Sequence, residues 1–223
     1  GKKKIVVAGI LATLMAGQAV QVDAAGKFAG AAPPKGIAIS TTDAGSVASA
    51  NGNNAIAIGR ANADHNGAIA IGSDAVSAGN AVSIGWLAKG TGDSSLAFGK
   101  QTTASGSDAL AFGSSSQATA NSATAIGNGA NASNTNAIAV GTSAAASGNN
   151  SAAVGKSAQA DQDNDNAFGT SVHANGGGAT AIGYLVNTTG NQAFGGGSNT
   201  TVSGTAAVGI GYSNTASGDR SIS

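Results

Sequence analysis

The sequence is poor in the residue types from which most globular cores and reaction centres are built. Its 223 residues contain no cysteine, only two prolines and 4% aromatic residues, and all ten acidic residues are aspartates. The lack of cysteine excludes a disulfide scaffold and a cysteine-ligated zinc site. Ten basic residues balance the ten acidic ones and charged residues make up only 9% of the chain, so no basic footprint for nucleic acid is present.

Small residues dominate what remains. The chain holds 36 glycines, and its hydrophobic fraction of 41% consists mostly of alanine. A globular core depends on Leu, Ile, Val and Phe to bury enough apolar area against chain entropy. Here these large residues are few and regularly spaced, which favours a thin, repetitive architecture.

The segment 1–25 has the order of a secretory signal peptide. Lys2, Lys3 and Lys4 precede an apolar run from Ile5 to about Val20, and small residues close the segment at 24–25. A transmembrane anchor is the disfavoured alternative, because glycines and a glutamine leave the apolar run short of the ~20 residues of a span. We expect export across the inner membrane after cleavage at 24 or 25.

Residues 26–50 form a lead-in segment before the regular part of the chain. The pair Pro33-Pro34 predicts an extended or turning connection. Residues 36–40 read as one short strand. Ser40 resembles a degenerate marker glycine, but its distance to Gly59 exceeds one unit, so the segment is not assigned to the repeats.

Residues 51–223 consist of about twelve repeated units. A glycine marks each unit, at spacings of 13, 13, seven times 14, 12 and 14. Just before it stands a larger apolar residue, preceded in most units by alanine. The marker glycines are Gly59, Gly72, Gly85, Gly99, Gly113, Gly127, Gly141, Gly155, Gly169, Gly183, Gly195 and Gly209.

Alternation of large and small residues before each glycine predicts a short strand with one side facing a core. We predict that the larger residues form this core and that the alanines beside them face another chain, which makes the protein an oligomer. The predicted core residues are Ile58, Ile71, Ile84, Phe98, Phe112, Ile126, Val140, Val154, Phe168, Ile182, Phe194 and Val208.

The second half of each unit has small residues at alternate positions and then a Gly, Asn, Ser or Asp cluster, which predicts a second short strand and a turn. Such a unit is too short for a helical crossover between parallel strands. The units can instead coil and stack at about 4.8 Å per coil. The predicted fold is all-β, a parallel β-solenoid of about twelve coils with a length of roughly 55 Å at that spacing.

The units Asn-Ala-Ile-Ala-Val-Gly (136–141) and Asn-Ser-Ala-Ala-Val-Gly (150–155), recurring behind a signal peptide, resemble the YadA-like head of trimeric autotransporter adhesins. The resemblance implies a left-handed parallel β-roll and a homotrimer at the bacterial outer membrane. It implies adhesion to a host matrix protein, of the collagen, fibronectin or laminin type, or to another cell-surface ligand. It implies no enzymatic activity and no cofactor. We expect residues 51–223 to be a head truncated before any stalk or membrane anchor, so the membrane would be reached only through that missing C-terminal anchor.

Collagen binding in that family is associated with an Asn-Ser-Val-Ala-Ile-Gly type of repeat. Its best match here places alanine where the family has valine, so collagen as the ligand is open. The matched residues are Asn150, Ser151, Ala152, Ala153, Val154 and Gly155.

The position after each marker glycine is too varied for an interior column and is predicted to face solvent. Exposed Trp, Tyr and Arg are the residue types that dominate the contact energy at interfaces, so this column is the candidate ligand surface. The alternative is that Trp86 covers a groove between chains or fills a turn. The candidate residues are Arg60, Trp86, Lys100, Lys156 and Tyr184.

Other functions find little support. The run 161–166 resembles the start of a calcium loop, but Asn166 replaces its glycine and Val172 its closing glutamate. No nucleophile elbow or phosphate loop occurs. We therefore expect no catalytic, cofactor or metal residues. A structural spacer within a longer surface fibre remains the alternative function.

Overall fold

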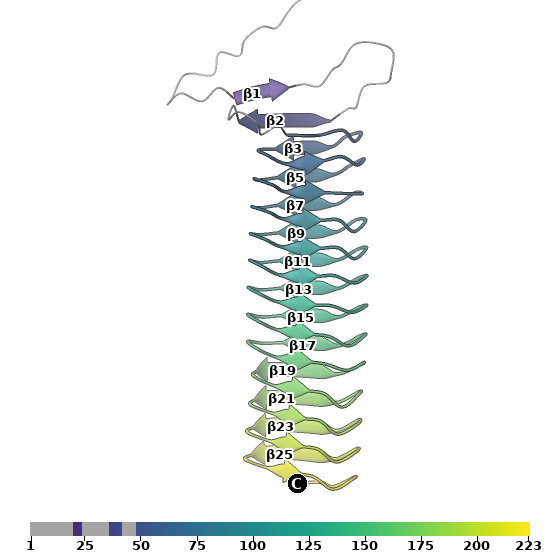
Figure 1. Cartoon of the computed structure of the whole chain (residues 1–223). Helices are drawn as coiled ribbons and strands as arrows, with labels where there is room; N and C mark the ends of the chain where they lie inside the picture. Colours follow the sequence, from purple (N-terminus) through teal and green to yellow (C-terminus); the bar gives the residue numbers. More distant parts are fainter. Residues whose placement is uncertain (1–19, 24–35, 42–47) are drawn as a thin grey trace, which may run out of the picture.

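The computed structural model describes residues 20–23, 36–41 and 48–223, and these form an all-β solenoid (Figure 1). One 14-stranded sheet has the order β1-β2-β3-β5, and so on through the odd-numbered strands to β25. A 12-stranded sheet contains the even-numbered strands from β4 to β26. Each coil contributes one strand to each sheet, so the predicted solenoid of about twelve coils is confirmed.

The first sheet contains the strand that precedes each marker glycine. Its strands are β1 (Val20–Asp23), β2 (Ile37–Thr41), β3 (Ile56–Ile58), β5 (Ile69–Ile71), β7 (Val82–Ile84), β9 (Leu96–Phe98), β11 (Leu110–Phe112), β13 (Thr124–Ile126), β15 (Ile138–Val140), β17 (Ala152–Val154), β19 (Asn166–Thr170), β21 (Thr180–Tyr184), β23 (Phe194–Ser198) and β25 (Val208–Tyr212).

The second sheet contains the two-residue strands of the second half of each unit. They are β4 (Asn62–Ala63), β6 (Val76–Ser77), β8 (Lys89–Gly90), β10 (Thr103–Ala104), β12 (Gln117–Ala118), β14 (Asn131–Ala132), β16 (Ala145–Ala146), β18 (Gln159–Ala160), β20 (His173–Ala174), β22 (Asn187–Thr188), β24 (Thr201–Val202) and β26 (Thr215–Ala216).

The lead-in strand predicted at 36–40 is β2, which pairs in parallel with β3 so that Ile39 lies beside Ile58. This register puts Ser40 at the place of a marker glycine. β1 lies within the predicted signal peptide and pairs antiparallel with β2. The rest of that peptide and the Pro33-Pro34 connection lie outside the described residues, and the division at residue 25 stays a prediction. Within the described part of the chain, no helix has the length and apolarity needed to cross a membrane.

Stacking is in register, so each residue lies beside its counterpart in the next coil. Leu96, Leu110 and Thr124 are neighbours, as are Phe98, Phe112 and Ile126. Two early coils are one residue shorter, and this difference falls in the turns, so the strands stay aligned. Each strand forms backbone hydrogen bonds with the parallel strands of the coils before and after it. The backbone N–H and C=O groups of the strands are therefore paired along the whole solenoid.

The turn after each first-sheet strand depends on its marker glycine. Gly141 has φ +134°, and a Cβ atom there would lie 2.4 Å from the carbonyl oxygen of Gly155 in the next coil. Both the backbone conformation and the close approach exclude other residues. At the other edge, side chains of one coil accept hydrogen bonds from backbone N–H groups of the preceding coil. Asn121 Oδ1 accepts the N–H of Ser107 at 3.2 Å, and Asp163 Oδ1 accepts the N–H of Asn149 at 2.8 Å.

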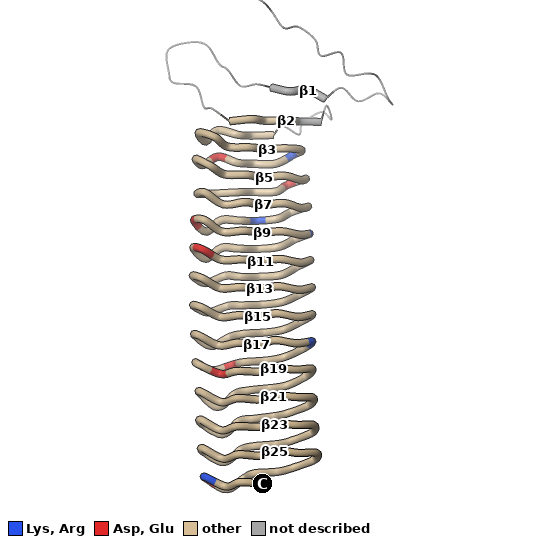
Figure 2. The backbone as a smooth tube through the Cα atoms, turned by 180° about the vertical axis from the view of Figure 1, so that it is seen from behind, with Lys and Arg blue, Asp and Glu red and all other residues tan. Residues whose placement is uncertain are grey.

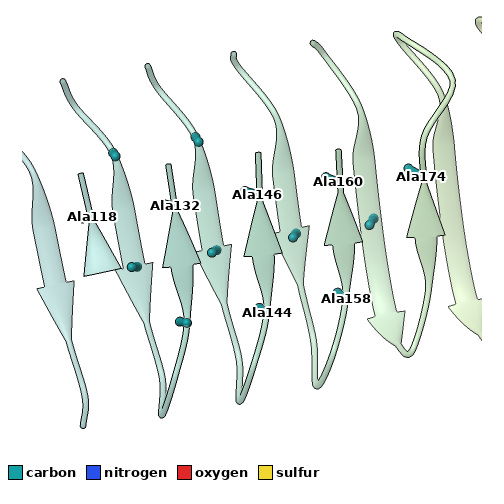
Figure 3. Packing of buried hydrophobic residues seen from close by; sticks show 14 of the residues in the cluster. Ala118, Ala132, Ala144, Ala146, Ala158, Ala160 and Ala174 are labelled. Atoms are coloured by element: carbon teal, nitrogen blue, oxygen red, sulfur yellow. The ribbon is translucent and has the colours of Figure 1, made fainter. Parts of the chain in front are cut away.

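The interior is made of small residues, which corrects the predicted core. Alanines of both sheets point inward and fill the space between them (Figure 3), and Ala139, Ala146 and Ala153 are fully buried. The predicted core residue Phe112 is instead 54% exposed. Each coil closes with two tight turns, so the sheets lie close together and the interior accepts little more than methyl groups.

The twelve larger residues lie on the outer face of the first sheet, where they are half-buried or exposed, and the alanines predicted to meet another chain fill the interior. Phe98 and Phe112 do stack in adjacent coils, with ring centroids 5.9 Å apart, but on this outer face. The predicted core was therefore wrong for Ile58, Ile71, Ile84, Phe98, Phe112, Ile126, Val140, Val154, Phe168, Ile182, Phe194 and Val208.

The register also corrects the last two marker glycines. Gly197 and Gly211 continue the column of Gly183, whereas Gly195 and Gly209 lie in the inward column of Ala181. Glycine is needed there because larger residues face it: a Cβ at Gly195 would lie 2.2 Å from Thr188 Oγ1 and 2.9 Å from Val186 Cγ1. With this correction the spacing of the marker glycines stays constant to the end of the array.

One inward position carries an acidic side chain. Asp165 is fully buried in a column that is otherwise mostly alanine, and its carboxylate accepts the N–H groups of Ala179 (2.8 Å) and Gln162 (3.0 Å). In the following coil the equivalent N–H, that of Ala193, donates to the backbone oxygen of Gly190. Asp165 therefore replaces a backbone acceptor at the glycine-rich turn 176–178.

Replacing Asp165 by alanine should destabilise the solenoid by about 2 kcal/mol, because a buried N–H is left without an acceptor. Chemical denaturation would show this loss, and hydrogen exchange of the Ala179 amide should accelerate. Asp163→Ala is the matched control, since that carboxylate accepts bonds from Asn149 at an exposed turn. Equal stability of the Asp165 and Asp163 variants would contradict this role.

Candidate ligand-binding site

The turn between β7 and β8 presents the side chain of Trp86. Gly85, with φ +137°, ends the strand, and Leu87 takes a left-handed conformation with φ +56°. Trp86 lies between these two turn residues, and its side chain is 44% exposed. The prediction that Trp86 faces solvent agrees with this burial.

The next coil places Lys100 beside the tryptophan. Its Nζ lies 5.1 Å from the centroid of the Trp86 ring, a distance at which a cation is attracted to the negative face of the ring. The two residues occupy the same column in consecutive coils. The coil geometry therefore brings together two of the predicted site residues.

A hollow of about 140 Å³ is lined by Leu87 and Gln101, which directly follow Trp86 and Lys100 in the chain, and by Lys89 and Thr103. Lys89 and Thr103 are direct neighbours on β8 and β10, and Leu87 and Gln101 are equivalent turn residues of the two coils. None of these four was a predicted site residue. A search along the columns adjacent to Trp86 and Lys100 would have found them.

Arg60 lies in the same column but is engaged elsewhere. Its guanidinium forms an ion pair with Asp74, which also accepts a bond from Ser73 Oγ. The side-chain hydrogen bond between the two raises the pKa of Arg60 and lowers the pKa of Asp74. Lys156 and Tyr184 are exposed in the same column but belong to coils four and six beyond that of Lys100. The candidate surface thus splits into one cluster and three separate residues.

The adhesin-type repeat at 150–155 has two faces. Ser151 is buried, with its hydroxyl donating to the Gly148 oxygen at 2.7 Å, and Ala153 is fully buried. Asn150 is exposed and accepts a bond from Asn136 Nδ2 at 3.0 Å. Ala152 and Val154 lie on the outer face of the first sheet, so only part of this motif can touch a ligand.

The aspartates of the run 161–166 have separate partners. Asp161 Oδ2 lies 2.7 Å from His173 Nε2, Asp163 bonds Asn149, and Asp165 points inward. They do not converge on one point, and the described residues contain no group of metal-ligating side chains.

The repeats match the family model "YadA head domain repeat (2 copies)". The matches cover residues 44–60, 91–116, 104–130, 118–144, 132–158, 146–171 and 203–223, together more than half of the chain. The chain belongs to the YadA head-repeat family. The resemblance drawn from the repeat units is confirmed, and membership makes the chain an adhesin-type head and not an enzyme.

Among solved structures, the collagen-binding domain of the Yersinia adhesin YadA is similar. It is 32% identical, with a TM-score of 0.40, over 63% of this chain and 64% of that chain, so this chain spans less than two thirds of that domain. None of the curated proteins matches the chain. YadA-family adhesins are outer-membrane surface proteins.

Proposed function

We propose that this chain is the head of a homotrimeric surface adhesin that binds host matrix or cell-surface ligands through several copies at once. The observation that supports this best is the apolar outer face of the first sheet. Along it, Leu96, Phe112, Ile138 and Ile182 are each more than a third exposed. A continuous exposed apolar stripe of this kind marks an interaction surface, and closed symmetry would cover it in each chain.

The two outer faces of the solenoid differ in chemistry, which supports separate tasks. The outer column of the second sheet carries mainly polar residues such as Gln117, Asn131 and Gln159. We infer that the first sheet packs against the other chains and that the second sheet and the turns remain open to ligands. Three equivalent surfaces per trimer, and many trimers on a cell, would turn weak contacts into high avidity.

The assembly is tested with Phe112→Asp, which places a charge in the apolar stripe. We expect the wild type to sediment as a trimer and this variant to dissociate, because three carboxylates would be buried without partners. Gln117→Asp, on the outer face of the second sheet, is the control and should remain trimeric. A monomeric wild type, or a trimeric Phe112→Asp variant, would rule out this interface.

Adhesion is tested with the wild-type trimer on collagen, fibronectin, laminin and host cells. Collagen is one candidate ligand, because 150–155 resembles the repeat associated with collagen binding. We expect binding to at least one surface and its loss in the Phe112→Asp monomer. A trimer that binds none of them would favour the alternative function, a rigid spacer. The uniform in-register stacking along the solenoid would also suit that function.

A further inference from the structure

We propose that the hollow beside Trp86 binds one anionic sugar residue, carboxylated or sulfated, of a host glycan; this rests on the proposed adhesin function and names a ligand class for it. Trp86 and Lys100 come from the post-glycine column. Leu87, Lys89, Gln101 and Thr103 line the hollow between the same two coils.

One lysine, Lys89, lines this hollow, and a second, Lys100, directly precedes the lining residue Gln101. Lys89 and Lys100 are both exposed and, within residues 36–41 and 48–223, neither forms an ion pair, whereas Arg60 is paired with Asp74. Figure 2 shows the lysines of these coils away from the edge that carries the aspartates before β9 and β11. The nearest acidic residue at this edge, Asp74, stands at the place of Leu87 in the preceding coil and is paired with Arg60. A nearby anion would therefore meet two ammonium groups while this carboxylate is engaged by the guanidinium.

The tryptophan supplies both an apolar surface and a fixed place for one ammonium group. Its ring attracts Lys100 and still leaves nearly half of its surface in water. The C–H groups of a sugar ring are weakly positive and pack against the negative face of an aromatic ring. Tryptophan is also enriched among the few residues that supply most of the binding energy at interfaces.

The hollow also offers neutral hydrogen-bonding groups. Gln101 contributes an amide and Thr103 a hydroxyl, which suit the hydroxyl groups of a sugar. Its volume of about 140 Å³ is below the roughly 300 Å³ of pockets that enclose a drug-sized ligand. One residue of a longer saccharide chain fits such a space. An extended acidic peptide fits less well, because the neighbouring strands are already paired on both sides and leave no edge to extend.

The hollow stays accessible in the proposed trimer. Lys89 and Thr103 lie on the outer face of the second sheet, while the apolar stripe lies on the first. Packing of chains through the stripe would therefore leave the three hollows of a trimer open.

The experiment measures binding of the full chain to immobilised sulfated dextran, carboxymethyl dextran, neutral dextran and poly-glutamate. We expect at least tenfold tighter binding to one charged dextran than to neutral dextran or poly-glutamate, and the two charged dextrans distinguish sulfate from carboxylate. The double variant Lys89→Gln/Lys100→Gln should lose at least tenfold, and Trp86→Ala about fivefold, with Trp86→Phe closer to the wild type.

The matched control is Arg220→Gln, which removes one exposed positive charge near the end of the solenoid and should change binding by less than twofold, whereas the single variant Lys89→Gln should weaken binding at least threefold. Thermal melting of each variant separates loss of binding from loss of fold. Equal weakening in the control, no effect of Trp86→Ala in a folded protein, or equally tight binding to poly-glutamate would overturn the sugar site. If host cells are still bound while no dextran is, the sugar inference fails and the adhesin proposal stands.

Discussion

Replacing Gly155 by alanine should destabilise the solenoid by about 3 kcal/mol or more. Its φ is +135°, and the added Cβ would lie 2.0 Å from the carbonyl oxygen of Gly169 in the next coil. The neighbouring backbone cannot move away without breaking its own pairing. Denaturation of the wild type and the variant, compared at equal protein concentration, measures the loss.

Gly129→Ala is the matched control for this prediction. Gly129 has φ +63°, and the nearest atom to an added Cβ is Ser143 Oγ at 3.8 Å. The equivalent positions of the next two coils hold Ser143 and Ser157, both left-handed. The cost should be about 1 kcal/mol, which is the usual penalty for alanine in that conformation. Similar losses at Gly155 and Gly129 would show that coil contact at the marker glycine is not the cause.

Substitution by leucine should reduce the stability of the protein much more at Ala153 than at its neighbour Ala152. Ala153 is fully buried between the two sheets, so Ala153→Leu forces a large side chain into a space of methyl size and should cost about 3 kcal/mol or more. Ala152 lies on the outer face, beside Ile138 in the preceding coil. In the monomeric Phe112→Asp background, where this face is uncovered, Ala152→Leu should therefore change stability by less than about 1 kcal/mol.

This pair of variants separates the two possible orientations of the strand. Thermal melting and far-ultraviolet circular dichroism of both proteins give the answer. If Ala152→Leu unfolds the chain while Ala153→Leu is tolerated, the larger residues face inward and the alanines outward. That outcome would also remove the basis for an apolar contact face on the first sheet.

The repeat predicted the solenoid, its number of coils and its columns, because a fixed period in sequence becomes a fixed direction in space. It did not predict which side of the strand faces inward. Alternation of Ile138, Ala139 and Val140 is the same pattern in either orientation. The deciding quantity is the space inside so short a coil, and Ala146 and Ala160 on the opposite strands show how little there is.

The prediction of the last two marker glycines was wrong for a related reason. The pattern before Gly195 and Gly209 copies that of a marker glycine, because Phe194 and Val208 precede them. In the structure these glycines compensate for larger inward residues such as Val202. Such a compensation links positions on opposite strands, and a single column of the sequence does not contain it.

The site could be predicted in part. Trp86 and Lys100 share a column, so the period alone brings them into adjacent coils. Lys89 and Lys100 are not separated by a whole unit, so the repeat period alone does not bring them together. Their proximity follows only from the pairing of β8 with β10, which places Lys89 beside Thr103. The hollow depends on side chains from two columns, which only the folded coil defines.

The in-register stacking has a consequence for how such a head can vary between related proteins. Adding or deleting one whole unit changes the length by a single strand spacing of about 4.8 Å and leaves every other residue facing as before. Length can therefore vary in steps without a new packing problem. The site between the coils of Trp86 and Lys100 sets one restriction, because a unit inserted between those two coils would separate its halves, whereas a unit inserted elsewhere would only move the site along the fibre.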